Sequence, residues 1–258
     1  MNTLHISLLQ ADLSWENVQE NINYFTEQID KISNDLDLIV LPEMFTTGFS
    51  MNAKELAEEM NGKTVNWMRE TAIKKQSAVV GSVIISENKN FYNRLFFVFP
   101  SGELQYYDKK HTFTLAKEHE TYNSGSNKLI VEYKGWKICP LICYDLRFPV
   151  WARNVEDYDL LIYVASWPEK RINAWDTLLK ARAIENMSYT IGVNRIGKDG
   201  NNYDYVGHSI LFDCLGNPLS QEQNERQETI SVQIEKESQG EIRNKLGFLK
   251  DKDKFKLV

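Results

Sequence analysis

Apolar and polar positions along the first part of the chain predict strands and helices in alternation. Short apolar runs at 4–9, 36–41 and 78–85 are bounded by polar residues, which indicates buried strands. The polar segment 15–32 carries apolar residues at a spacing of three to four, which indicates an amphipathic helix. Thr64 can cap a second helix. This part of the chain therefore predicts the order β-α-β-α-β.

Turn residues divide the middle of the chain into hairpins. Pro100-Ser101-Gly102 separates two strand-like runs. Lys134-Gly135 separates two more, and the second of these runs ends at Cys143. Because the strands of a hairpin are antiparallel, the sheets cannot be purely parallel.

The second half repeats the alternation. Strands are expected at 160–165, 189–193, 209–212 and 229–234, with a helix at 174–187 that Asn173 can cap. Elements in this order indicate sheets that are covered by helices on their outer faces. The predicted fold class is α/β, a four-layer α-β-β-α sandwich with two mixed sheets.

No linker or low-complexity segment interrupts the chain, so residues 1–258 are predicted to form a single domain. The segment from roughly 236 to 258 is rich in Lys, Glu and Asp and has weak apolar periodicity. It is interpreted as a C-terminal arm that lies over the surface or on a partner.

Charge and cysteine content narrow the possible partners and compartment. A net charge of −6 argues against a nucleic-acid partner, because phosphate binding needs clustered Lys and Arg. The N-terminus lacks a secretory signal, and no apolar stretch is long enough to cross a membrane. Three cysteines, an odd and sparse set, suit a reducing compartment. The protein is expected to be cytoplasmic.

Three chemically useful residues follow predicted strands. Glu43 comes directly after the run 36–41, Lys109 follows the second strand of the first hairpin, and Cys143 ends a strand before Pro149 opens a helix. A helix N-terminus near Cys143 would favour the thiolate. Each residue also has a structural interpretation: a buried cysteine, a loop glutamate and a solvated lysine, with Lys110 as a rival to Lys109.

Other chemistries lack their motifs. The sequence has no G-x-S-x-G elbow, no clustered His and Cys with metal-ligand spacing and no Gly-rich phosphate loop. No metal and no cofactor are therefore expected. Cys139 and Cys214 are interpreted as buried apolar residues, and a pairing of a cysteine with His111 or His119 stays open at this point.

Three sequence blocks resemble those of the nitrilase superfamily of carbon–nitrogen hydrolases. The blocks are LIVLPEMFTTGF, YYDKKH and ICYDLRFP, in the order that the family has them. The resemblance implies that Glu43, Lys109 and Cys143 are the catalytic triad. It also implies that the lysine of the triad is Lys109 rather than Lys110. A second family glutamate in the following loop matches Glu118, with Glu120 as a rival.

The resemblance also implies a reaction. Glu43 would act as the base, Cys143 would form a thioester, and Lys109 with the Tyr144 backbone N–H would hold the oxyanion. Arg171 is the candidate for binding a substrate carboxylate, while Arg147, two residues past Asp145, is assigned to a structural ion pair in that segment. Phe45 and Trp167 are candidates for apolar pocket walls, with packing in the core as the alternative for each.

Within the superfamily, the chain looks most like the omega-amidase group that acts on 2-oxoglutaramate or 2-oxosuccinamate. Hydrolysis of an N-carbamoyl compound or of an aliphatic amide is the alternative activity. A catalytically silent scaffold with this fold is the alternative from another class. A homodimer that pairs through helices beside the nucleophile segment and through the C-terminal arm is implied by resemblance.

Overall fold

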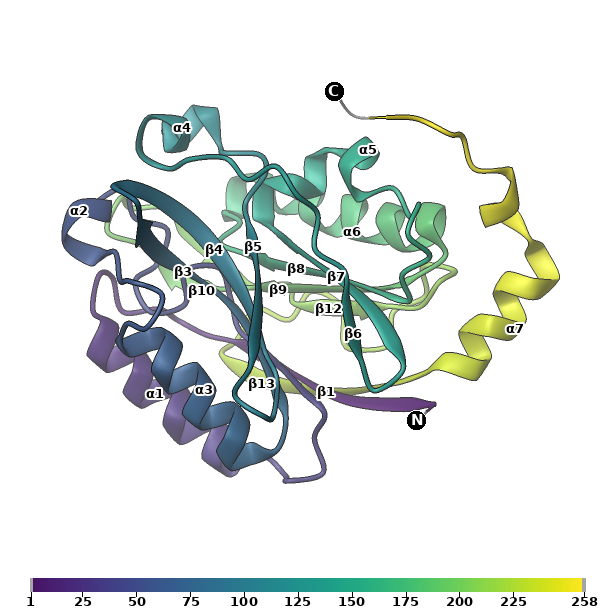
Figure 1. Cartoon of the computed structure of the whole chain (residues 1–258), viewed down its shortest axis with the longest axis horizontal. Coiled ribbons are helices and arrows are strands. Elements are labelled where there is room, and N and C mark those ends of the chain that lie inside the picture. The colour runs from purple at the N-terminus through teal and green to yellow at the C-terminus, as the bar shows by residue number, and fades with distance from the viewer. Residues whose placement is uncertain (1, 257–258) are drawn as a thin grey trace.

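The structure is a computed structural model that describes residues 2–256, and its strands form two large sheets (Figure 1). The first sheet has six strands in the order β13-β1-β2-β3-β4-β5. β1 pairs in parallel with β2, and β2 with β3, while the remaining neighbours are antiparallel. The bounds of its strands are β1 (Thr3–Gln10), β2 (Leu38–Val40), β3 (Ala78–Glu87), β4 (Asn90–Val98), β5 (Leu104–Asp108) and β13 (Glu228–Glu235).

The second sheet has five strands in the order β12-β9-β8-β7-β6. Its three central strands are parallel and its two edge strands are antiparallel. The prediction of two mixed sheets is confirmed. The bounds are β6 (Val131–Tyr133), β7 (Trp136–Ile142), β8 (Leu160–Ala165), β9 (Tyr189–Asn194) and β12 (Ile210–Phe212).

Helices cover the outer face of each sheet. α1 (Val18–Lys31) and α3 (Lys63–Lys75) pack on the first sheet, and α6 (Ile172–Asn186) packs on the second next to β9 and β12 (Figure 1). Alternate side chains of a strand point to opposite faces. Thus Leu38 and Val40 of β2 face the second sheet, while Ile39 faces the helices. The predicted four-layer sandwich is confirmed.

Two helices begin differently from expectation. α3 starts at Lys63 with Gly62 as its N-cap, so Thr64 lies inside the first turn. The carboxylate of Glu58, from the preceding loop, accepts a hydrogen bond from the Thr64 N–H at 2.6 Å and thereby supplies the cap. α6 continues directly from the 3₁₀ helix η3 (Glu169–Arg171), so Arg171 and not Asn173 precedes it.

Several short elements were not predicted. The hairpin of β10 (Ile196–Lys198) and β11 (Asp204–Val206) forms a separate two-stranded sheet. The others are α2 (Ala53–Leu56), η1 (Thr114–Ala116), α4 (Glu118–Thr121), η2 (Cys143–Arg147) and η4 (Phe248–Asp251). The short helix expected to open at Pro149 is present as α5 (Pro149–Ala152).

The C-terminal arm contains a helix, α7 (Lys236–Leu246), and runs along one edge of the molecule (Figure 1). Its polar side chains contact the second half of the same chain. Arg243 donates to the carbonyl oxygens of Tyr158 and Met187, each at 2.7 Å. Gln239 donates to the carbonyl of Asp159 at 2.8 Å. Because polar contacts hold this helix, its sequence shows little of the apolar periodicity by which a helix is predicted.

None of the helices in residues 2–256 is both long enough and apolar enough to cross a lipid bilayer.

Candidate active site

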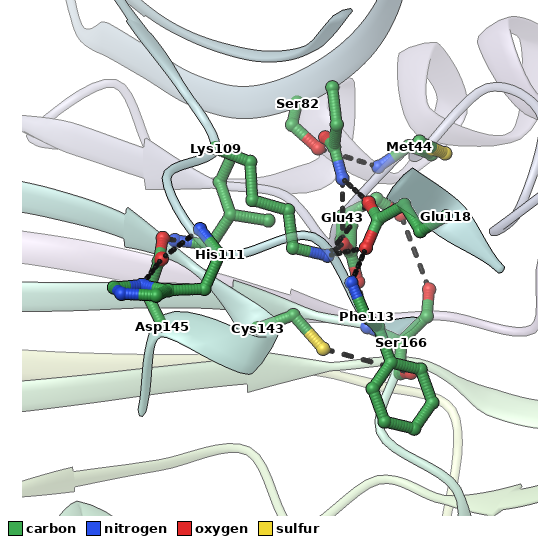
Figure 2. A network of polar contacts seen from close by, with 12 residues as sticks. Glu43, Met44, Ser82, Lys109, His111, Phe113, Glu118, Cys143, Asp145 and Ser166 are labelled. Carbon is green, nitrogen blue, oxygen red and sulfur yellow. Dashed lines mark hydrogen bonds and ion pairs between the residues drawn. The ribbon is translucent and has the colours of Figure 1, made fainter. Parts of the chain in front are cut away.

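The predicted triad converges from the ends of three strands. Glu43 follows β2 by three residues, Lys109 follows β5 directly, and Cys143 follows β7 directly. The first two belong to one sheet and Cys143 belongs to the other. Figure 2 shows their side chains directed into one site between the sheets. All three are at least nine-tenths buried.

Lys109 is the centre of a buried ion cluster. Its ammonium lies 2.8 Å from Glu43 Oε1 and 3.0 Å from both carboxylate oxygens of Glu118 (Figure 2). Glu118 begins α4 and is fully buried, whereas Glu120 is exposed and pairs with Lys117 at 3.9 Å. Lys110 lies 5.6 Å from the centre of the Trp151 ring. The geometry therefore distinguishes Lys109 and Glu118 from their neighbours.

Two residues that were not predicted complete the surroundings of Glu43. Asn93 of β4 donates from Nδ2 to Glu43 Oε1 at 2.7 Å and lies 3.5 Å from Glu118 Oε1. The backbone N–H of Ser166, just after β8, donates to Glu43 Oε2 at 2.8 Å. The sequence held only a weak signal for Asn93, which stands beside Arg94 just before the apolar run 95–98 of its strand. Ser166, like Glu43, follows a buried strand.

Burial and neighbouring charges shift the pKa values of Lys109 and Glu118. Burial lowers the pKa of Lys109, but the charges of Glu118 and Glu43 outweigh this and raise its pKa overall. Burial raises the pKa of Glu118, which Lys109 opposes and Glu43 reinforces. The negative charge of Glu43 beside it and its own burial thus both favour the protonated form of Glu118.

Cys143 lies in a strained turn. Its φ is +42°, in the left-handed region that residues other than glycine rarely adopt. Its sulfur lies 3.9 Å from the Ser166 carbonyl oxygen. Burial and the charge of Glu43 raise the thiol pKa well above its usual value, with Lys109 acting in the opposite direction. These effects oppose the expected stabilisation of the thiolate by a helix N-terminus, so attack by Cys143 calls for a base.

A cavity of about 340 Å³ opens beside Cys143. Trp167 and Tyr144 lie in its wall, as do two arginines. The guanidinium of Arg147 lies 4.9 Å from the centre of the Trp167 ring, and that of Arg171 lies 5.1 Å from the centre of the Phe113 ring. Within residues 2–256, neither guanidinium has a hydrogen-bonded or ion-paired partner. The cavity thus contains two uncompensated cations.

The ion pair expected of Arg147 does not form. The Asp145 carboxylate instead accepts hydrogen bonds from the Tyr107 hydroxyl and from the backbone N–H groups of His111 and Ile142. Arg147 lines the cavity.

Phe45 is not a pocket wall. Met44 has a φ of +45°, and after this turn Phe45 packs between Phe25 and Trp67 in the core under the helices. Phe49, four residues further on, lines the cavity in its place.

The hairpin of β10 and β11 supplies a wall that the sequence did not indicate. Asp199, Asn201, Tyr203 and Tyr205 of this hairpin line the cavity. Asp199 accepts hydrogen bonds from the Tyr205 hydroxyl at 2.9 Å and from the backbone of Asn201 and Tyr203. The Asp199 carboxylate therefore stabilises the turn of the hairpin.

No three His, Cys, Asp or Glu side chains among the described residues are arranged to hold a metal ion. The polar groups at Cys143 are instead those of acid–base and nucleophilic chemistry: a thiol, a carboxylate and an ammonium.

Comparison with known proteins agrees with this geometry. The carbon-nitrogen hydrolase family model matches residues 5–244. The chain is 42% identical to the Omega-amidase YafV of Yersinia enterocolitica over the full length of both proteins. It is 35% identical to the 2-oxoglutaramate amidase of Bacillus subtilis, covering 95% of this chain and 96% of that protein. A CN-hydrolase superfamily protein of Xanthomonas campestris, whose crystal structure has an arsenic adduct in the active site, superposes with a TM-score of 0.97 at 42% identity over both whole chains. The chain belongs to the carbon-nitrogen hydrolase family.

Proposed function

We propose that this enzyme is an omega-amidase, which hydrolyses the terminal amide of 2-oxoglutaramate or 2-oxosuccinamate to a carboxylate and ammonia. The names of its relatives support this substrate class. The observation that carries the proposal is the cavity, which has the Cys143 thiol in its wall together with the unpaired guanidinium groups of Arg147 and Arg171. A small amide that also bears a carboxylate matches both features.

Acylation begins with the neutral thiol. Glu43 takes the proton of Cys143 while the sulfur attacks the amide carbon, and the carbonyl oxygen becomes an oxyanion. The Lys109 ammonium and the Tyr144 backbone N–H stabilise that oxyanion. The Tyr144 N–H belongs to the first turn of η2, where N–H groups have no partner within the helix. Loss of one such donor typically costs about 3 kcal/mol of transition-state stabilisation.

Collapse of the oxyanion breaks the carbon–nitrogen bond. Glu43 returns its proton to the leaving nitrogen, so ammonia departs and a thioester remains on Cys143. A water molecule then loses a proton to Glu43 and attacks the thioester carbon. The carbon–sulfur bond breaks, the sulfur regains the proton, and the acid product leaves. Glu118 holds Lys109 in place throughout, and Lys109 keeps its positive charge.

The cationic residues fix the other end of the substrate. A guanidinium binds a carboxylate through two parallel hydrogen bonds, and the aromatic faces of Trp167 and Phe113 hold the two guanidinium groups in orientation. Binding at Arg171 or Arg147 would leave the amide end of the substrate toward Cys143.

The test is ammonia release from a panel of amides. 2-Oxoglutaramate and 2-oxosuccinamate are expected to be the best substrates, with no carbon dioxide formed. Preferred cleavage of an N-carbamoyl compound, which also yields carbon dioxide, or of an aliphatic amide would replace the proposed substrate. No release from any amide, with Cys143 unreactive toward iodoacetamide, would support a silent scaffold.

The proposal extends to assembly and compartment. A homodimer is supported by exposed apolar side chains on and near the outer helices, among them Val150 of α5 and Ile184 of α6, which are half exposed. A cytoplasmic, single-domain protein is supported by three free cysteines in the described residues and by a core cluster that spans both sheets. Light scattering would measure the assembly state.

A further inference from the structure

Asp145 is a fully buried carboxylate that takes no part in the reaction steps above. One oxygen accepts the backbone N–H of His111 at 3.0 Å and lies 2.7 Å from the His111 ring nitrogen Nδ1. The other accepts the Tyr107 hydroxyl at 2.7 Å and the backbone N–H of Ile142 at 3.1 Å. A carboxylate can only accept, so the ring donates from Nδ1.

These contacts join the two segments that carry the reacting groups. Lys109 lies midway between Tyr107 and His111, and Ile142 immediately precedes Cys143. Figure 2 shows the Asp145 and His111 side chains meeting beside Lys109, on the side away from Glu43. One buried carboxylate thus connects the lysine segment of the first sheet to the nucleophile turn of the second.

The nucleophile turn needs such a connection. Cys143 has a left-handed backbone, a conformation that persists at a site when the surrounding contacts hold it. Asp145 holds both sides of the turn, because it is part of η2 itself and also binds the N–H of Ile142 before it.

His111 is the accessible member of the connection. Its ring stacks on Phe148 with centres 3.6 Å apart and an angle of 5°, and about a fifth of its side chain is exposed. Neither His111 nor Asp145 is among the residues that line the described cavity, so they do not reach a substrate there.

We infer that Asp145 and His111 form a positioning pair, which sets the Cys143 thiol at its working distance from Lys109 and Glu43. The pair transfers no proton. This inference rests on the proposed function for its effect on turnover, but its effect on the reactivity of Cys143 can be measured without any substrate.

The test uses two substitutions that separate the hydrogen bond from the ring. His111→Phe keeps an aromatic ring on Phe148 and loses Nδ1. His111→Asn loses the ring but keeps an amide nitrogen at the position of Nδ1. His119→Phe, an exposed histidine of α4, is the matched control. For each full-length variant, kcat and KM with 2-oxoglutaramate and the Cys143 alkylation rate with iodoacetamide are measured well below Tm, with peptide mass spectrometry to separate Cys143 from Cys139 and Cys214.

We expect H111F to lower kcat by about 10- to 100-fold with little change in KM, because a small misplacement of reacting groups lowers the reaction rate strongly. H111F should also change the alkylation rate of Cys143. H111N should recover most of both values, and H119F should match the wild type. Wild-type kcat and alkylation in a folded H111F, or equal losses in H111F and H111N, would overturn it. A wild type that releases no ammonia would defeat the proposed function, while the alkylation rates would still decide the positioning role.

Discussion

The ammonium of Lys109 lies 2.8 Å from Glu43 Oε1, and neither side chain has more than one per cent of its surface exposed. Both carboxylate oxygens of Glu118 bind the same ammonium at 3.0 Å. Two carboxylates therefore share one cation in a site that excludes solvent. A substitution in this cluster should change both the stability of the folded protein and its activity.

Lys109→Met should cost both stability and activity. Removing the ammonium leaves two buried carboxylates facing each other, and breaking a buried ion pair costs about 3–5 kcal/mol. Urea unfolding would measure the loss, and ammonia release should fall below detection. Lys110→Met is the matched control, because Lys110 makes no contact with either glutamate, and it should change neither measurement appreciably. A K109M protein as stable as the wild type would contradict the claim that Lys109 compensates the charges of Glu43 and Glu118.

Glu118→Gln should alter the pH dependence of stability. Burial raises the pKa of Glu118 in the folded protein, so the folded state binds that proton more tightly than the unfolded state does. The contribution of Glu118 is therefore fully present below its unfolded pKa and is lost as pH rises through its raised folded pKa. Relative to the wild type, E118Q should therefore gain stability as pH rises above about 4.5, the ordinary pKa of a glutamate, toward the raised pKa of folded Glu118. The exposed Glu120→Gln variant should show no such trend in urea unfolding.

Arg171→Met and Arg147→Met should weaken use of acidic substrates. Each guanidinium is unpaired in the cavity, and a hydrogen bond to a charged group contributes about 1.5–3 kcal/mol, which corresponds to roughly 10- to 100-fold in kcat/KM. The loss should appear with 2-oxoglutaramate and not with a neutral aliphatic amide. Lys170→Met, an exposed neighbour, serves as the control. Equal losses on both substrates would place the arginines in a structural role.

Asn93→Leu should slow the reaction, measured as kcat for ammonia release. Asn93 donates to Glu43 at 2.7 Å and lies 3.5 Å from Glu118, so its amide holds the Glu43 carboxylate in position. Leucine has a similar shape and no donor. Asn90→Leu, at the exposed start of the same strand, is the control. An unchanged kcat would show that Lys109 and the Ser166 N–H suffice to position Glu43.

Gly125→Ala should disturb the lysine segment from outside the site. A methyl group at Gly125 would lie 2.1 Å from the Asp108 carbonyl oxygen, and the Gly125 N–H donates to the Lys109 carbonyl at 2.9 Å. Since backbone must move to admit the methyl group, we expect lower kcat together with a lower Tm, measured by ammonia release and thermal unfolding. Gly240→Ala, which meets no atom within 4 Å, should leave both unchanged.

The layers of the fold were predictable because apolar periodicity reports burial. Strands β1, β3 and β8 alternate or run apolar as buried strands do, and short turns mark the hairpins. The hairpin of β10 and β11 is short and half exposed, and α7 is held by polar contacts, so neither has a periodic pattern to detect.

At the site, Glu43, Lys109 and Cys143 could be predicted from the sequence because each follows a strand, and the end of a strand fixes the position of the residues after it. Phe45 and Phe49 both follow Glu43 closely, and only the left-handed turn at Met44 decides which of them reaches the cavity. The Ser166 contact to Glu43 comes from a backbone N–H, which any residue could supply. Arg147 was misassigned because its neighbour Asp145 binds groups more than thirty residues away, at Tyr107 and His111.

The most direct test of the account is to trap the covalent intermediate. The full-length enzyme is mixed with 2-oxoglutaramate, quenched in acid during turnover and digested, and the Cys143 peptide is weighed by mass spectrometry. The account predicts an acyl group on Cys143, absent from Cys139 and Cys214 and absent in Cys143→Ala. Rapid ammonia release with no acyl group on Cys143, or turnover that persists in C143A, would contradict it.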